Sequence, residues 1–140
     1  MAKIAINPPG LFQSRQYGFS QVVSASGART VYFSGQVAWD ENQNIIGPGD
    51  LHAQTIQSLK NLELGVRVAG GAMADVVSLR IYIRHDVMEQ GRYVKDGLLE
   101  FFPGDAPPAA TWIGVQSLAD QDFLIEIEAI AVIEEEVATF

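Results

Sequence analysis

The feature that constrains the fold of this chain most is an alternation of apolar and other residues near its end, LIEIEAIAVI at residues 124–133. Side chains of a β-strand alternate between the two faces of a sheet, so the pattern predicts a strand with one apolar face. That face carries Ile125, Ile127, Ala129, Ala131 and Ile133. The opposite face carries Leu124, Glu126, Glu128, Ile130 and Val132. Carboxylates on such a mixed face are solvated, paired with a cation or part of a site.

Length and composition indicate one domain spanning residues 1–140. The chain has 140 residues, and its 48% hydrophobic content is enough for a single core. Its formal charge of -8 repels a phosphate backbone, so we expect no nucleic-acid partner. The absence of cysteine rules out disulfides, thiolate zinc sites and thiol nucleophiles. Because no apolar run reaches the roughly 18 residues that span a bilayer, and no apolar signal segment opens the chain, we expect a cytoplasmic protein without a membrane partner.

Residues 21–40, QVVSASGARTVYFSGQVAWD, predict two strands joined by a turn around Gly27, since β-branched and aromatic residues lie on both sides of it. Alternation along the second strand places on one face Val31, Phe33, Gly35 and Val37. The other face receives Tyr32, Ser34, Gln36 and Ala38. A short third strand is expected around Ile45 and Ile46, after a segment rich in turn-forming residues.

The remaining sequence predicts two helices and three strands. Asp50 suits the cap of a helix whose apolar residues recur at helical spacing until a pair of glycines ends it. Residues 76–84, VVSLRIYIR, alternate as a half-buried strand. Residues 89–102 predict a second helix, interrupted by Gly97. The last two strands are expected at residues 110–116 and 122–133.

The element order β-β-β-α-β-α-β-β predicts an α+β fold, a two-layer sandwich in which both helices cover one face of a mixed sheet. The other face is then bare and mixes apolar, polar and charged residues: Ser34, Gln36, Arg80, Tyr82, Arg84, Ala110, Trp112, Glu126, Glu128, Ile130 and Val132. In a chain of this size such a face is typical of a subunit interface. We therefore expect a homo-oligomer with any site where the bare faces meet.

Four segments resemble, in order and spacing, the reactive intermediate deaminase (RidA-like) family, also described as L-PSP endoribonucleases. They are VYFSGQVAWDENQNII, HAQTIQSLKNLELGVRVAGG, ADVVSLRIYIRHD and LIEIEAIAVI, and the likeness covers residues 17–133. The resemblance implies a chorismate-mutase-like fold and a homotrimer with small-molecule ligand clefts between subunits. Active members of the family hydrolyse enamines and imines such as 2-aminoacrylate and 2-iminopropionate to a keto acid and ammonia, so the resemblance implies no metal and no cofactor.

The resemblance also implies roles for particular residues. Glu126 stands where the family has a glutamate that orients the attacking water, and Ser34, in SGQ, stands where it has a serine at the cleft. Phe19, in GFSQ, replaces a tyrosine. Ala110, in PPAATWIGV, replaces the arginine that binds the substrate carboxylate, so we expect a substrate other than 2-iminopropionate. Trp112 replaces a small residue and is expected to narrow the cleft. The expected substrate-binding residues are Phe19, Ser34, Arg80, Ala110, Thr111 and Trp112.

Alternatives stay open for the charged residues and for the function. Glu126 and Glu128 could simply pair with Arg80 and Arg84, or Arg80 could offer a relocated guanidinium to an anionic ligand. The chain is either a cofactor-free hydrolase or a non-catalytic trimer that binds a metabolite or a protein in the same clefts. The negative charge and the lack of a histidine pair weigh against a ribonuclease, and the two histidines lack the spacing of metal ligands.

Overall fold

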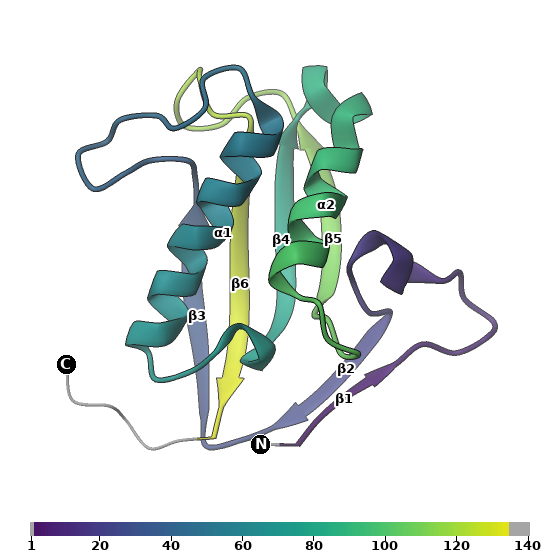
Figure 1. Ribbon diagram of the computed structural model, residues 1–140. Helices are drawn as coiled ribbons and strands as arrows, with labels where there is room; N and C mark the ends of the chain where they lie inside the picture. Colours follow the sequence, from purple (N-terminus) through teal and green to yellow (C-terminus); the bar gives the residue numbers. More distant parts are fainter. Residues whose placement is uncertain (1, 135–140) are drawn as a thin grey trace.

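Two helices cover one face of a four-stranded sheet in the computed structural model, which describes residues 2–134 (Figure 1). The strand order is β3-β6-β4-β5, with β4 and β5 parallel and the other neighbours antiparallel. These strands are β3 (Arg29–Gln36), β4 (Val76–Arg84), β5 (Ala109–Val115) and β6 (Ile125–Ile133). The α+β sandwich with a mixed sheet is confirmed, and the described elements run in the order β-β-β-α-β-α-β-β, although the three strands before α1 are not the three predicted ones.

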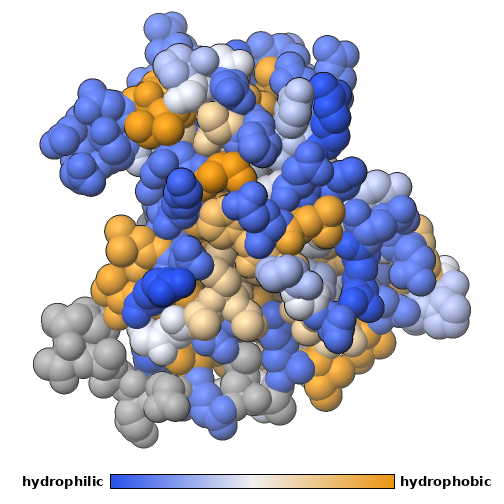
Figure 2. All heavy atoms as spheres, in the orientation of Figure 1, coloured by the Kyte–Doolittle hydropathy of each residue, from blue (hydrophilic) through white to orange (hydrophobic). Residues whose placement is uncertain are grey.

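The core lies between the sheet and the helices α1 (Leu51–Val68) and α2 (Gly91–Phe101). Its fully buried members include Leu59, Leu62, Val66, Leu79, Ile81, Ile83, Ile125, Ile127, Ala131 and Ile133. The apolar faces predicted for β6 and for most of β4 are therefore confirmed. From the helix side, mainly hydrophilic residues are visible, with hydrophobic groups scattered between them (Figure 2). Among residues 2–134, no helix is both long and apolar enough to cross a membrane.

A side-chain cap begins α1, and a glycine of α2 lies where the two helices meet. The Asp50 side chain accepts a hydrogen bond of 3.0 Å from the backbone N–H of Ala53, which confirms the predicted cap of α1. Gly97 does not interrupt α2, contrary to the prediction. A Cβ at this position would lie 2.8 Å from Cγ2 of Thr55 and 3.3 Å from Cδ1 of Leu59, both on α1. The missing side chain thus lets the two helices approach closely.

The N-terminal third differs from the expectation in its strands. An unpredicted strand, β1 (Ala2–Ile6), pairs antiparallel with β2 (Val22–Ser26) in a separate two-stranded sheet. The turn around Gly27 therefore connects two sheets, since β3 pairs with β6 instead of β2. The third strand expected at residues 45–46 is reduced to one isolated bridge between Trp39 and Ile45.

A bulge in β3 reverses the alternation predicted for its second half. Phe33 lies opposite Ala129, but Gln36 lies opposite Ile127, so β3 contains one residue more than β6 over this stretch. Gln36 is therefore paired with a core residue, and Ala38 is fully buried. The prediction that Gln36 lies on the bare face, with Ala38 on the same side of the strand, is wrong, because alternation holds only while the two strands keep the same register.

Candidate functional site

Glu126 lies on the bare face of the sheet, where β6 runs between β3 and β4. It is half-buried, and its register partner on β4 is Tyr82. Its carboxylate lies over Gly35 of β3, so that a Cβ added to Gly35 would be 1.9 Å from Oε2 of Glu126. The bulge turns Gly35 toward this face, which alternation had not predicted. Within residues 2–134 the Glu126 side chain has no hydrogen bond or ion pair, so both oxygens are available to water or a ligand.

The neighbouring carboxylate, Glu128, is held by the protein. The hydroxyl of Tyr82 donates a hydrogen bond to Oε1 of Glu128. Arg84 donates to Asp86, with 2.7 Å between Nε and Oδ1, so its suggested pairing with the two glutamates is wrong. Arg80 is the register partner of Glu128, yet none of the ion pairs found within residues 2–134 includes it. The two carboxylates on this face therefore differ: Glu128 accepts a hydrogen bond from Tyr82, and Glu126 has no side-chain partner among residues 2–134.

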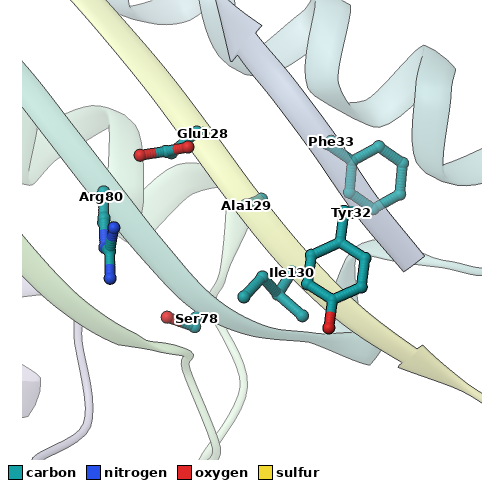
Figure 3. Close-up of a pocket in the computed structure, with 7 residues that line it drawn as sticks. All are labelled: Tyr32, Phe33, Ser78, Arg80, Glu128, Ala129 and Ile130. Carbon is teal, nitrogen blue, oxygen red and sulfur yellow. The ribbon is translucent and has the colours of Figure 1, made fainter. Parts of the chain in front are cut away.

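A pocket of about 280 Å³ opens on the bare face beside Glu128 (Figure 3). It is lined by Tyr32, Phe33, Ser78, Arg80, Glu128, Ala129 and Ile130. The side chain of Arg80 extends away from Glu128, toward the level of Ser78. Neither Glu126 nor Ser34 lines it, so this pocket and the half-buried carboxylate of Glu126 are adjacent but separate features of the sheet.

The contact with Glu128 shifts the pKa of the Tyr82 hydroxyl. The hydrogen bond to the carboxylate is the main cause that raises the pKa of Tyr82 above its usual value, helped by desolvation and by the charge of Glu128, while Arg80 acts in the opposite direction. A pKa raised by folding makes the contact stabilising below the ordinary tyrosine pKa, and this stabilisation is lost as the pH rises through the raised value.

We expect Glu128→Gln to move the pKa of Tyr82 back toward its ordinary value. Absorbance titration of the tyrosines measures this change. The ionisation of Tyr82 is expected at a higher pH than an ordinary tyrosine, and it is identified as the transition that Tyr82→Phe lacks. If the ionisation of Tyr82 stays at the same pH in Glu128→Gln, another group raises the pKa of this tyrosine.

Strand β5 does not present the residues expected of it to the bare face. Ala110 and Trp112 lie opposite core residues of β4 and pack against the core beneath the helices. The ring of Trp112 lies under the start of α2, where a Cβ added to Gly91 would be 3.1 Å from Cζ3. The prediction that Ala110 and Trp112 share the face of Glu126 is wrong. Thr111, between them, is exposed and is the register partner of a bare-face residue, Arg80.

Phe19 lies beside the beginning of β5, because the next residue, Ser20, forms a parallel bridge with Ala109. The residues expected at the site thus form two groups within one chain. Ser34 and Glu126 lie on or beside β3, and Phe19 and Thr111 lie on or beside β5. Since β3 and β5 are the two edges of the sheet, Ser34 is three strand spacings, roughly 14 Å, from Thr111, and Glu126 on β6 is two strand spacings, roughly 10 Å, from it. One chain does not bring them together.

Two residues of this face were not recognised as functional from sequence. Gly35 was assigned to the wrong face, and Tyr82 was placed on the bare face without a role. Antiparallel pairing of two alternating strands is the signal that could have joined Tyr82 to a glutamate. Among residues 2–134, no group of three or more His, Cys, Asp or Glu side chains is arranged to hold a metal ion.

Comparison with known proteins agrees with this fold. Residues 14–133 match the family model described as Endoribonuclease L-PSP. A 2-iminobutanoate/2-iminopropanoate deaminase from Dermatophagoides farinae is 33% identical over 116 residues, which cover 83% of this chain and 86% of that protein. A Rid-family protein of unknown function from Yersinia pestis is 41% identical, with a TM-score of 0.89 over 94% of this chain and 99% of that one. RidA from an Antarctic Psychrobacter is 25% identical, with a TM-score of 0.65 over 81% and 87% of the two chains. The chain therefore belongs to the L-PSP endoribonuclease family, as a RidA-like member.

Proposed function

We propose that this protein hydrolyses a small imine or enamine to a carbonyl compound and ammonia. The observation that carries the proposal is the half-buried carboxylate of Glu126, which lies over Gly35 without a protein partner among the described residues. A carboxylate with available lone pairs can accept a proton from water at neutral pH. The exposed hydroxyl of Ser34, one residue before Gly35, is suited to hydrogen-bond the substrate. The name of the mite relative supports the same class of reaction.

In the proposed reaction Glu126 moves each proton. It accepts a proton from water while the water oxygen bonds to the imine carbon, and it passes that proton to the imine nitrogen, which gives a carbinolamine. It then accepts the hydroxyl proton and returns it to the nitrogen as the C–N bond breaks. A carbonyl compound and ammonia leave, and Glu126 is again ionised. An enamine enters the same sequence after protonation at carbon gives the imine.

The proposed site is completed by a second copy of the chain. The group at the β3 edge and the group at the β5 edge can meet only if the β3 edge of one copy lies next to the β5 edge of another. Such a head-to-tail contact closes into a ring, and the family resemblance implies a ring of three. We expect sedimentation at micromolar concentration to report an oligomer. A monomer would contradict this part of the proposal.

The substrate is expected to differ from 2-iminopropionate, because Ala110 supplies no guanidinium for a carboxylate. An amino-acid oxidase can generate a series of imines in place from amino acids of different size, and ammonia release is followed above the uncatalysed rate. We expect acceleration for at least one imine of the series, and less for 2-iminopropionate than for that imine. Uncatalysed rates throughout, with a ligand retained by the protein, would favour the second candidate, a non-catalytic trimer that binds a metabolite.

A further inference from the structure

Three aromatic rings form a contiguous cluster next to the start of β5. The ring of Phe12 meets the ring of Tyr17 with 6.3 Å between centroids and the ring of Phe19 with 6.2 Å, and both contacts are edge-to-face. Phe19 belongs to the expected substrate-binding group at the β5 edge, and the residue after it, Ser20, bridges to Ala109. The aromatic cluster, Phe12, Tyr17 and Phe19, therefore extends the β5-edge side of the proposed site.

This cluster lies beside the helix layer and not on the bare face of the sheet. Tyr17 ends a short 3-10 helix, Ser14–Tyr17, which Figure 1 shows beside β5. The next residue, Gly18, has a φ of +93°, and a Cβ there would lie 2.7 Å from Cβ of Leu98 on α2, so the glycine seats the loop against this helix. In the proposed oligomer the β3 edge of a neighbouring copy lies next to β5. The aromatic cluster then borders the proposed cleft between the two copies.

Hydrogen bonds hold the backbone of both phenylalanines. The side chain of Gln21 donates to the carbonyl oxygen of Phe12 at 3.0 Å. The hydroxyl of Ser14, which is fully buried, donates to the carbonyl oxygen of Phe19 at 2.8 Å. Asn7 closes the loop, because its Oδ1 accepts from the backbone N–H of Gln21 at 2.8 Å. The rings are therefore presented by an ordered backbone, which lowers the entropic cost of binding a ligand.

The loop that carries the aromatic cluster has no unpaired charge. Arg15 is the only charged residue between positions 4 and 28, and its guanidinium is paired with Asp105 at 3.1 Å. An aromatic wall of this kind suits an apolar ring, which can pack edge-to-face as the three rings do with one another.

We propose that the aromatic cluster makes the site selective for imines that carry an aromatic side group. The inference rests on the proposed hydrolysis and names its substrate class. Glu126 of one copy acts at the C=N carbon, and the cluster of the neighbouring copy packs against the aromatic ring of the substrate. Phe12 determines the specificity, since it contacts both other rings and is 61% exposed in the single chain.

Ammonia release from two imines tests the selectivity. An amino-acid oxidase generates 2-imino-3-phenylpropanoate from phenylalanine and 2-iminopropionate from alanine. We expect kcat/KM of the parent chain to be at least about tenfold higher for the phenyl imine, because even one extra methylene in an apolar pocket discriminates by about this factor. Equal values for both imines would overturn the proposal and leave the proposed hydrolysis standing.

A substitution of Phe12 assigns the selectivity to the cluster. Phe12→Ala is expected to lower kcat/KM for the phenyl imine by about tenfold and to leave the value for 2-iminopropionate within about twofold of the parent. If Phe12 served only folding or a subunit contact, both values would fall together, and this outcome would contradict the proposal. The control is Leu64→Ala, which truncates a 65% exposed apolar residue of α1 and should change neither value.

Binding of the carbonyl products separates this inference from the proposed reaction. Calorimetry is expected to show that the parent chain binds phenylpyruvate at least about tenfold more tightly than pyruvate, and that Phe12→Ala loses this difference. If neither imine is hydrolysed but the difference in binding is found, the proposed reaction is wrong and the aromatic site stands. If the parent chain binds both products equally, the aromatic site is wrong, with or without turnover.

Discussion

Replacing Glu126 with Gln is expected to remove the proposed acceleration of ammonia release and to leave the fold and the proposed oligomer intact. Glutamine is close to glutamate in size, so the side chain can still lie over Gly35, but an amide cannot accept a proton from water. General-base catalysis typically contributes about 10²–10⁴-fold to a rate, which sets the expected loss. The measurement is ammonia release from the best imine of the series at equal protein concentration.

Glu128→Gln is the matched comparison for this prediction, because it changes a carboxylate on the same strand and face that already accepts from Tyr82. We expect its loss of turnover to be much smaller than that of Glu126→Gln. Turnover by Glu126→Gln at the parent rate would remove Glu126 from the mechanism. Sedimentation of both variants checks that the assembly has not changed.

Gly35→Ala is expected to reduce turnover by about 10²-fold, the cost of misplacing a reacting group by roughly 1 Å. The new methyl group would lie 1.9 Å from Oε2 and 2.7 Å from Cγ and Cδ of Glu126, so the carboxylate must move. The backbone of Gly35 does not have a positive φ, so alanine introduces no strain of its own. The effect on thermal stability should therefore be small compared with the effect on turnover.

Gly104→Ala provides the control for that substitution. It makes the same chemical change at a glycine where an added Cβ meets no atom within 4 Å, and it should retain parent turnover and stability. If Gly35→Ala also hydrolyses imines at the parent rate, the position of the Glu126 carboxylate over Gly35 has no part in the reaction.

The sequence predicted those parts of the fold in which a repeated pattern reports burial directly. Strict alternation in β6, and in β4 from Leu79 onward, assigned the core faces correctly because every second side chain of a strand lies on one side. The cap at Asp50 and the 3.6-residue period located α1 for the same local reason. These signals depend on neighbouring residues only, so the sequence alone contains them.

The predictions from sequence failed where the structure of a segment depends on pairing with a strand that is distant in the chain. The segment ATWIGV has no strict alternation, and the face of Trp112 follows from the parallel register of β5 with β4. The strand β1 exists because β2 is available to pair with it. The fold class and the position of Glu126 on the bare face could be predicted from sequence, but the distance between Ser34 on one edge strand and Thr111 on the other depends on strand order, which no local pattern encodes.

The bulge in β3 makes the number of residues between Phe33 and Ala38 as important as their identity. Removing one residue there would restore an unbroken alternation and turn Ala38 out of the core. It would also place a residue other than Gly35 against the Glu126 carboxylate. Insertions and deletions are usually tolerated best in connecting segments. In this chain a deletion inside a strand would alter core and site together, so relatives that share this arrangement of glutamate and glycine should differ here by substitution and not by length.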